Sequence, residues 1–208
     1  MLRTDGPNQI VLASGSPRRK ELLAQVGLSP VAVVPANTVE VRLEGEKPKA
    51  LVERLACRKA EVVAKTLNGK WVVAADTVVV AGNRILGKPS TQVEARKFLQ
   101  LLSGRRHRVL TGVVVIRPDG ELSRRIVTTT ITFKRLEGDE IERYLSSGEW
   151  HGKAGAYAIQ GYAGAFVRHL TGSYSNVVGL PLYETLALLR GLGFVFPREI
   201  NVVKKNDG

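Results

Sequence analysis

Apolar and polar positions along the chain alternate between two patterns. Continuous apolar runs predict short buried strands over Ile10–Ala13 and Val31–Val34, and a longer strand over Trp71–Val80. The last run is almost wholly apolar, which is typical of a strand that is buried on both faces. Between these runs, apolar residues recur at helical spacing over Pro17–Val26 and Lys49–Leu67. The first half of the chain therefore predicts strands that alternate with helices.

The second half adds a hairpin to this alternation. Thr91 and Glu94 form a capping-box pattern that begins a helix, and the turn signal Pro118-Asp119-Gly120 separates two strand-like runs. The predicted elements are a strand over Arg84–Leu86, a helix ending at Leu102, hairpin strands over Val109–Ile116 and Leu122–Phe133, a helix over Asp139–Leu145, a strand over Ala165–Arg168 and a helix over Leu182–Leu189. The polar end Lys204–Gly208 is expected to fray.

This order of elements predicts an α/β fold with mixed sheet pairing and a single domain over residues 1–208. The helix-rich half gives way to the hairpin near Gly104–His107, so a division into two lobes is expected there. With 208 residues, the chain is long enough for one substantial core. Its apolar content of 44% is that of an ordinary soluble globular protein.

The net charge of +12 at pH 7 points to anionic partners, namely nucleotides, nucleic acid or acidic membranes. The basic residues are scattered, however, and their clusters are short, so the charge does not single out nucleic acid. A basic surface that serves only solubility is the alternative. The single cysteine, Cys57, excludes an internal disulfide and fits a reducing compartment. No secretory signal or membrane-length apolar stretch is found, so we expect a soluble, cytoplasmic protein without a membrane partner.

The stretch VLASGSPRRK at residues 11–20 predicts an anion-binding turn. A strand ends near Ser14, and Ser16 and Pro17 suit the N-cap and first position of a helix. Two hydroxyls, the backbone N–H groups of the first helical turn and the guanidinium groups of Arg18 and Arg19 would then converge. Such a helix N-terminus suits a polyphosphate.

Two charged residues interrupt apolar patterns. Asp76 lies inside the run Trp-Val-Val-Ala-Ala-Asp-Thr-Val-Val-Val, where an ionised carboxylate is costly unless it is paired or bound to metal. It is the first candidate for a general base or metal ligand, and the alternative is an aspartate at a strand end bonded to a neighbouring loop. Lys59 lies near the middle of a helical apolar stripe, so its ammonium either extends to solvent or meets phosphate in a cleft.

Four further residues are weaker candidates when each is taken alone. Lys88 follows the Asp76 strand on a rigid Gly-Lys-Pro loop. Lys153 and Gln160 belong to a glycine-rich segment whose backbone N–H groups can approach a ligand closely, and an amide suits the reading of a base edge. Glu40 lies in an ordinary loop, where most glutamates are solvated, and it is a candidate metal ligand.

Six motifs in one order carry a family resemblance. They are LASGSPRRKELL at 12–23, ADT at 75–77, GKP at 87–89, LSG at 102–104, KAGAYAIQG at 153–161 and VGLPL at 178–182. Together they resemble the Maf family of nucleotide pyrophosphatases over nearly the whole chain. The resemblance implies an inosine-triphosphatase-like fold, with an elongated mixed sheet flanked by helices and a central cleft between two lobes. It also implies hydrolysis of a nucleoside triphosphate to the monophosphate and pyrophosphate with a divalent metal, Mg²⁺ or Mn²⁺.

The resemblance also implies roles for single residues. The aspartate of the ADT motif is the proton acceptor in the family, which here is Asp76, and Glu40 would share the metal with it. Our own hypothesis is that the triphosphate is held by Ser14, Ser16, Arg18, Arg19, Lys59, Lys88 and Lys153, with Arg18 also near the base. Residues 149–152 depart from the family pattern, so the resemblance does not predict the structure of the cleft entrance.

Arg18, Thr77 and Gln160 decide the expected substrate. These residue types are similar to the family branch that acts on dTTP and UTP. The branch that acts on 7-methyl-GTP carries tryptophan, glutamine and glutamate instead, and tryptophan would suit stacking on a cationic methylated purine. We therefore expect dTTP and UTP as substrates, with CTP or modified pyrimidine triphosphates open, as in a housecleaning enzyme.

The alternative from another class is a nucleic-acid-binding or septum-formation regulatory protein with little catalysis, which the net charge of +12 supports. A protein that binds a phosphate backbone does not need a carboxylate such as Asp76 inside an apolar strand, so nucleic acid is the disfavoured partner. The sequence leaves a homodimer open.

Overall fold

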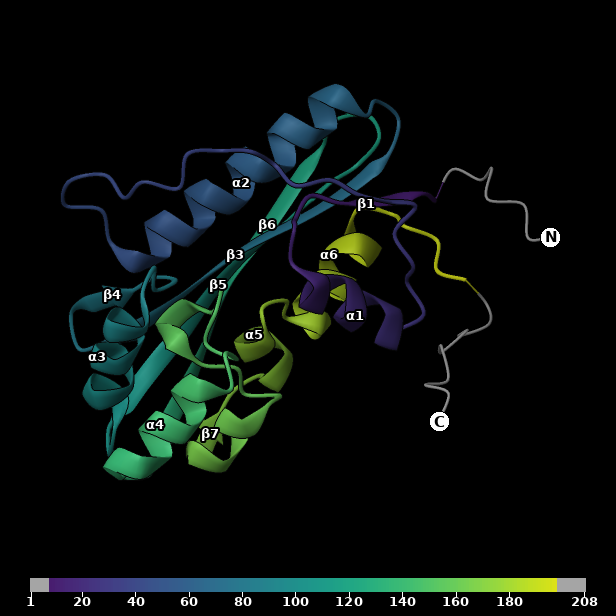
Figure 1. The fold of residues 1–208 in the computed structure, drawn as a ribbon. Coiled ribbons are helices and arrows are strands. Elements are labelled where there is room, and N and C mark those ends of the chain that lie inside the picture. The colour runs from purple at the N-terminus through teal and green to yellow at the C-terminus, as the bar shows by residue number, and fades with distance from the viewer. Residues whose placement is uncertain (1–7, 198–208) are drawn as a thin grey trace.

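Residues 8–197, which the computed structural model describes, form one seven-stranded sheet with helices on both faces (Figure 1). The strands are β1 (Ile10–Leu12), β2 (Ala32–Val33), β3 (Trp71–Ala81), β4 (Arg84–Leu86), β5 (Arg106–Ile116), β6 (Leu122–Phe133) and β7 (Val167–Thr171). The α-helices are α1 (Pro17–Gln25), α2 (Pro48–Thr66), α3 (Gln92–Leu102), α4 (Gly138–Ser146), α5 (Tyr174–Val178) and α6 (Leu182–Gly191). Two 3-10 helices are η1 (Ala154–Ala156) and η2 (Tyr162–Phe166).

The sheet mixes parallel and antiparallel pairs, which confirms the expected α/β class. Its order is β2-β1-β3-β5-β6-β7, and β4 pairs with β3 outside this path. β1 is parallel to β2 and to β3, whereas β3, β5, β6 and β7 form an antiparallel series. The long strands β3, β5 and β6 run side by side and make the sheet elongated (Figure 1).

The central strand β3 has an interrupted edge. One side of β3 pairs with β5 from residue 72 to residue 80. On the other side, β1 pairs with residues 71–73 and β4 pairs with residues 79–81. Residues 74–78 therefore have no strand beside them on that edge within the described chain, and Asp76 and Thr77 lie in this gap. Because successive side chains of a strand point to opposite faces, Asp76 and Thr77 face opposite sides of the sheet.

Helix α2 covers the face toward which Asp76 points (Figure 1). Its apolar residues pack on β3 and β5 in two clusters, one that includes Ala74 and Val114 and one that includes Val78 and Leu110. Asp76 lies between the two clusters along β3. The buried residues of α2 are Leu51, Val52, Leu55, Ala56, Lys59, Ala60 and Val63. The buried face of α2 thus contains Lys59, and the face of β3 against which it packs contains Asp76.

Gly112 lets α2 come close to the sheet beside Asp76. It is the partner of Asp76 across the β3–β5 pair. A Cβ atom at Gly112 would lie 2.5 Å from the carbonyl oxygen of Val52, so no larger residue fits without moving α2. Val52 precedes Lys59 by about two helical turns and lies on the same buried face. The missing side chain at Gly112 therefore sets the height at which Lys59 meets the sheet.

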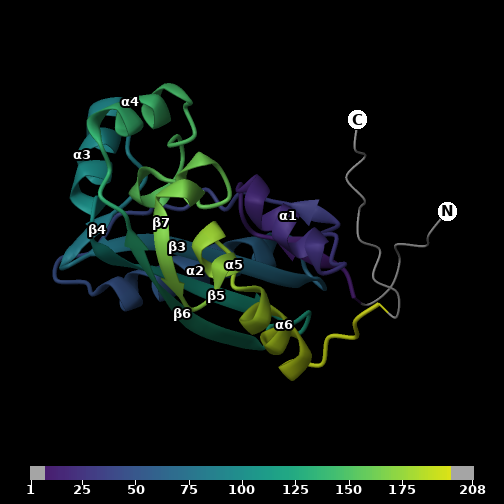
Figure 2. The same cartoon turned by 90° about the horizontal axis from the view of Figure 1, so that it is seen from below.

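The opposite face carries the larger core. Alternate residues of β3 and β5, such as Val73 and Val113, pack there with Ile131 and Phe133 of β6. The same cluster includes buried residues of α1, α3, α4 and α6, for example Leu23. Figure 2 shows α5 and α6 lying across this face, with α1 beside them and α3 and α4 toward the other end of the sheet.

Several predicted boundaries are corrected by the structure. Residues predicted as a strand over Ala165–Arg168 belong in part to η2, so the strand begins two residues later, at Val167, and continues to Thr171. The first hairpin strand begins at Arg106 rather than Val109 because residues 106–108 continue the pairing with β6. Helix α5 (Tyr174–Val178) has no counterpart among the predictions, since five residues do not establish a helical period.

The caps of α1 and α3 differ in detail from those predicted. Ser16 occupies the N-cap position of α1, but its side chain makes no capping hydrogen bond. Thr91 caps α3 by accepting from the Glu94 N–H at 3.1 Å. The Glu94 carboxylate accepts from the N–H and hydroxyl of Ser90, one residue before the cap, so the reciprocal half of the box is displaced.

The residues predicted to divide two lobes, Gly104–His107, span the end of the turn after α3 and the first two residues of β5, and this division stays a prediction. The end Lys204–Gly208, expected to fray, lies outside the described residues. Among residues 8–197, no helix combines the length and apolar character needed to cross a membrane.

His107 is a titratable residue inside the larger core. Its ring is 2% exposed and makes edge contacts with Phe133 and Tyr157. Its Nε2 atom lies 2.9 Å from the Tyr157 hydroxyl. Burial lowers the pKa of His107 to about 4, and the Arg105 backbone opposes this shift in part. The imidazole is therefore neutral in the folded protein at neutral pH.

This low pKa predicts a loss of stability between about pH 6.5 and pH 4. In that window the unfolded chain protonates His107 near its ordinary value of about 6.5, while the folded chain does not. The contribution is present above about pH 6.5, and its loss amounts to at most about 3 kcal/mol. In urea unfolding between pH 7 and pH 4, His107→Gln should show a shallower fall in the free energy of unfolding than the wild type. His169→Gln, at an exposed position, should keep the wild-type slope, and equal slopes in all three proteins would contradict the assignment.

Candidate active site

A cleft of about 880 Å³ opens at the gap in the edge of β3. Its volume lies within the range of small-molecule sites. The turn between β1 and α1, the loop before α2, the middle of β3 and the loop after β4 form its walls, together with segment 151–160 and the end of α5. It is lined by all eleven residues selected from the sequence, namely Ser14, Ser16, Arg18, Arg19, Glu40, Lys59, Asp76, Thr77, Lys88, Lys153 and Gln160.

One wall of the cleft holds two carboxylates joined by a lysine. The Lys59 Nζ atom lies 2.5 Å from Asp76 Oδ1 and 2.6 Å from Glu40 Oε1. Lys59 and Asp76 are each 6% exposed, so this ion pair is shielded from water on most sides. Of the two interpretations of Lys59, extension to solvent is thus wrong, and the ammonium faces the cleft. A buried Asp76 carboxylate is tolerated here because Lys59 supplies the opposite charge.

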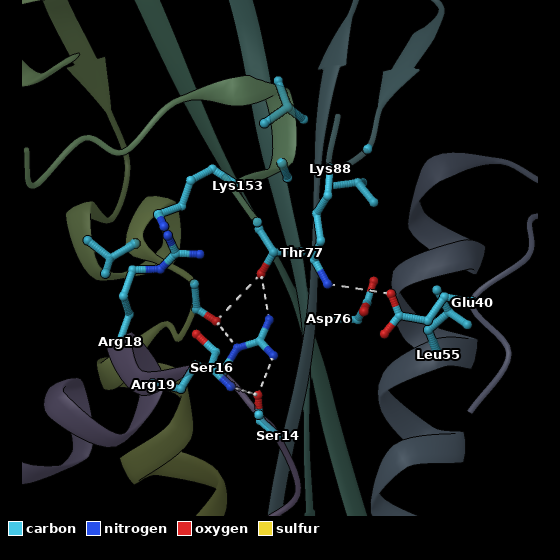
Figure 3. Close-up of a pocket in the computed structure, with 18 of the residues that line it drawn as sticks. Ser14, Ser16, Arg18, Arg19, Glu40, Leu55, Asp76, Thr77, Lys88 and Lys153 are labelled. Atoms are coloured by element: carbon cyan, nitrogen blue, oxygen red, sulfur yellow. Dashed lines mark hydrogen bonds and ion pairs between the residues drawn. The ribbon is translucent and has the colours of Figure 1, made fainter. Parts of the chain in front are cut away.

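Glu40 enters this wall from the loop before α2. Partial burial by itself would raise its pKa, but the hydrogen bond and charge of Lys59, with a smaller effect of Lys88, lower the pKa below its ordinary value. Lys88 Nζ lies 3.6 Å from the second carboxylate oxygen of Glu40 (Figure 3). Arg54 of α2 fixes the loop by donating to the Glu46 carboxylate at 2.6 Å and 2.8 Å. Glu40 is therefore held as an anion at the edge of the cleft.

Arg19 joins the elements on the other side of β3. Its guanidinium group donates to the Gly179 carbonyl at 2.8 Å, to Ser14 Oγ at 2.9 Å and to Thr77 Oγ1 at 3.2 Å (Figure 3). Burial lowers the pKa of Arg19, and the negative charges of Asp76 and Glu40 oppose that shift. All three partners are neutral, so the positive charge of Arg19 is not cancelled by direct contact with a carboxylate.

Thr111 and Asn176 extend this hydrogen-bond network below the cleft, and neither was selected from the sequence. Thr111 Oγ1 lies 3.0 Å from Thr77 Oγ1 and donates to the Asn176 carbonyl at 3.3 Å. The Asn176 amide donates to the Val109 carbonyl and to Thr129 Oγ1, which fixes α5 to β5 and β6. Thr111 interrupts an apolar run only weakly, and Asn176 follows the polar residues 173–175, so the sequence gives little signal for either. Their partners lie far along the chain.

Arg18 and Lys153 form a second positive wall opposite the carboxylates (Figure 3). Burial lowers the pKa of Arg18. Burial also lowers the pKa of Lys153, and the nearby positive charge of Arg18 lowers it further. The Nε atom of Arg18 is buried and has no hydrogen-bond partner among the described residues. Two cations that repel each other at one wall favour an anion between them.

The glycine-rich segment is held at both ends by contacts that the sequence did not reveal. The Gly155 N–H donates to the Gly87 carbonyl at 2.9 Å, which joins the loops of Lys153 and Lys88. Gly155 has φ of +67°, and a Cβ atom there would lie 2.9 Å from the Val79 side chain. At the other end, both carboxylate oxygens of Glu149 accept from the Tyr162 N–H, two residues after Gln160.

Glu149 belongs to residues 149–152, for which a departure from the family pattern was expected. The adjacent Trp150 is 5% exposed, and its indole N–H donates to the Leu145 carbonyl at the end of α4 at 3.1 Å. This anchor holds the turn that leads to Lys153, whose ammonium donates to the His151 carbonyl at 3.0 Å. The entrance of the cleft on this side is thus built on α4.

The donor set at the carboxylate wall suits a hard divalent cation in part. Glu40 and Asp76 offer carboxylate oxygens, which Mg²⁺ and Mn²⁺ prefer. Within residues 8–197, no group of three or more His, Cys, Asp or Glu side chains could hold a metal ion. Two carboxylates fit a cation that obtains its remaining ligands from water and from substrate phosphates.

Comparisons with known proteins give a consistent result over nearly the whole chain. The family model described as "Maf-like protein" matches residues 9–192. A "dTTP/UTP pyrophosphatase" of Caulobacter vibrioides is 55% identical over 185 residues, which cover 89% of this chain and 96% of the relative. A relative of the same description from Mesorhizobium japonicum is 53% identical over 192 residues, which cover 89% of this chain and 92% of the relative.

Among solved structures, the chain is similar to a HAM1 protein from Coxiella burnetii at 15% identity, with a TM-score of 0.46 and coverage of 89% of this chain and 99% of that one. It is also similar to the Ham1 protein of Staphylococcus aureus at 21% identity, with a TM-score of 0.42 and coverage of 61% and 72%.

Proposed function

The chain belongs to the Maf family, and from this premise we propose that it hydrolyses dTTP and UTP to the nucleoside monophosphate and pyrophosphate. It is then a nucleoside triphosphate pyrophosphatase, an enzyme of nucleotide metabolism. The observation that carries the proposal is the cleft itself, in which six cationic side chains surround two carboxylates. These cations are Arg18, Arg19, Arg42, Lys59, Lys88 and Lys153.

The cationic walls suit the triphosphate. Ser14, Ser16 and Arg19 lie at the N-terminus of α1, where the helix dipole favours an anion. Lys88 and Lys153 come from two loops on the opposite rim, joined through the Gly155 N–H. These groups would hold the phosphates, and Lys59 would join them from below. Their positive charge stabilises the negative charge that develops on the leaving pyrophosphate.

Asp76 is the proposed proton acceptor. It binds Lys59 through Oδ1, and its carboxylate lines the cleft at the open edge of β3. A water molecule that attacks the α–β phosphoanhydride gives its proton to this carboxylate, while the anhydride bond breaks and pyrophosphate leaves with the bridging oxygen. Glu40 and Asp76 would hold Mg²⁺ or Mn²⁺, which would supply charge neutralisation of the phosphates when bound.

Arg18 and Gln160 are the proposed specificity residues for the base, with Thr77. Arg18 and Gln160 both line the cleft. Arg18 lies on the side away from Glu40 (Figure 3). The Gln160 amide offers both a donor and an acceptor to a pyrimidine edge. Thr77 differs from the other two because its hydroxyl bonds to Arg19 and Thr111, so it acts on the substrate through the position of the Arg19 guanidinium.

A housecleaning role and a cytoplasmic location accompany this proposal. A cleft that accepts dTTP also leaves room for pyrimidines with a substituted base, and the half-buried thiol of Cys57 suits a reducing compartment. A homodimer is compatible with the proposal, which needs no residue from a second chain.

The substrate assignment is tested by incubating the protein with each natural triphosphate and Mg²⁺ and by analysing the products. We expect dTTP and UTP to give the monophosphate and pyrophosphate at higher kcat/KM than purine triphosphates. Orthophosphate and a nucleoside diphosphate would contradict cleavage of the α–β bond. Salt-dependent duplex binding without turnover would favour the nucleic-acid alternative instead.

Replacing Asp76 by asparagine should lower kcat by about 10²- to 10⁴-fold, because the amide cannot accept the proton of the attacking water. The amide oxygen can still accept from Lys59, so the thermal transition should be retained. Asp119→Asn, at the turn between β5 and β6, is the matched control and should keep full activity. Full activity of Asp76→Asn would exclude Asp76 as the base.

Arg18→Trp combined with Gln160→Glu should shift the preference toward 7-methyl-GTP. Tryptophan can stack on the cationic purine, and glutamate accepts from its donor edge. We expect the ratio of kcat/KM for dTTP to that for 7-methyl-GTP to fall by about tenfold or more. Lys20→Trp places the same ring on α1 outside the cleft and should leave the ratio unchanged. An unchanged ratio in the double variant would refute the specificity assignment.

A further inference from the structure

The Lys59 ammonium lies where the proposed function would also require a metal ion. Its ammonium bridges Asp76 Oδ1 and Glu40 Oε1 at 2.5 Å and 2.6 Å. The proposed metal would need oxygen atoms of the same two carboxylates. We propose that Lys59 is an internal counter-cation that holds the Asp76–Glu40 pair until a metal–triphosphate complex displaces it, so that metal binds only together with the nucleotide. This inference rests on the proposed function for the identity of the nucleotide.

The first argument is geometric. The Lys59 stem is buried in the face of α2 between Ala56 and Ala60, and the close approach of α2 at Gly112 fixes its distance from Asp76. The packing of α2 therefore fixes the position of the Lys59 ammonium beside the carboxylates. Glu40 is the most exposed of the three, because its side chain is 42% exposed whereas those of Lys59 and Asp76 are 8% and 9% exposed.

The second argument is the charge of the cleft without ligand. Lys59 and Lys88 offset the two negative charges of Asp76 and Glu40. The remaining cations of the cleft are Arg18, Arg19, Arg42 and Lys153, and none of them has a direct carboxylate contact among the described ion pairs. A bare divalent cation would thus enter a region of positive potential and would have to separate an ion pair. A triphosphate that brings the cation also brings the negative charge that these side chains lack.

The third argument is the number of ligands. Mg²⁺ in phosphate-handling sites is commonly held by one or two carboxylates, with waters and substrate phosphates as the other ligands. The described residues contain no cluster of three or more acidic, histidine or cysteine side chains at this position. The wall is therefore suited to a cation that already carries phosphate ligands. Once displaced from the carboxylates, the Lys59 ammonium faces the same cleft and is free to bind phosphate.

The experiment measures Mn²⁺ binding to the protein without nucleotide, by electron paramagnetic resonance of free Mn²⁺. The wild type should bind weakly. Lys59→Gln removes the competing charge while keeping a donor for Asp76, and should bind Mn²⁺ at least tenfold more tightly. Lys59→Arg, which retains the charge, should bind as weakly as the wild type. Addition of Asp76→Asn to Lys59→Gln should abolish the gain, because one of the two carboxylates is lost.

Lys88→Met is the matched control for charge alone. Lys88 also contacts Glu40, but at 3.6 Å and on an exposed side chain. If the gain reflects only the loss of one positive charge, Lys88→Met should match Lys59→Gln, and this result would overturn the proposal. Tight Mn²⁺ binding by the nucleotide-free wild type, or no gain in Lys59→Gln, would overturn it as well.

A measurement on the wild type decides the question if Lys59→Gln does not fold. In the presence of the α,β-methylene analogue of dTTP, the wild type should bind much more Mn²⁺. The amount bound should exceed by at least tenfold the sum of the amounts bound by the protein alone and by the analogue alone. Absence of that rise would overturn the proposal. None of these titrations requires turnover. A protein that shows the Lys59 pattern but cleaves no triphosphate would therefore contradict the proposed function and leave the counter-cation role intact.

Discussion

The neutralisation of one carboxylate inside the central strand constrains the rest of the structure. Asp76 is 6% exposed and lies between two apolar clusters, where a lone negative charge would be strongly destabilising. Lys59 supplies the opposite charge only because α2 lies close to the sheet. Gly112 permits this approach, and the small residues Ala56 and Ala60 accompany Lys59 on the buried face of α2. The neutralisation of Asp76 in the cleft thus depends directly on the packing of α2 against the sheet.

The interrupted edge of β3 turns this buried charge into an accessible one. β1 leaves the edge before residue 74, and β4 joins it only at residue 79. In a complete sheet, Asp76 and Thr77 would be covered by a neighbouring strand, but here both line the cleft. Because their side chains point to opposite faces, one strand supplies an ionic centre on the α2 side and a neutral hydrogen-bond network around Arg19 on the other. The two centres differ in net charge although they are adjacent in sequence, since Lys59 is paired with carboxylates and Arg19 is not.

Site residues that interrupt a local apolar pattern could be identified from the sequence alone. Asp76 breaks an apolar strand and Lys59 breaks an apolar helical stripe, and both are visible without knowledge of the fold. Their mutual contact was not predicted, because seventeen positions and a change of element separate them. Thr111, Asn176 and Glu149 break no pattern strongly enough, and their importance comes from partners far along the chain. The strand after η2 was misplaced for a related reason, since the 3-10 turn is fixed by contacts such as the one between Glu149 and the Tyr162 N–H.

The layout of the cleft separates the proposed chemistry from the proposed choice of base. Asp76 and Glu40 depend on α2 and on the loop that Arg54 fixes. The Gln160 segment depends on Glu149, and the adjacent Trp150 is bonded to the end of α4. Arg18 lies with Lys153 on the side away from the carboxylates (Figure 3). A substitution at Arg18 or Gln160 therefore alters the surroundings of the base without disturbing the packing of α2 on β3. Thr77 does not share this freedom, because its hydroxyl holds Arg19. Under the proposed function, the residues around the base can therefore change while the Asp76–Lys59 pair stays the same.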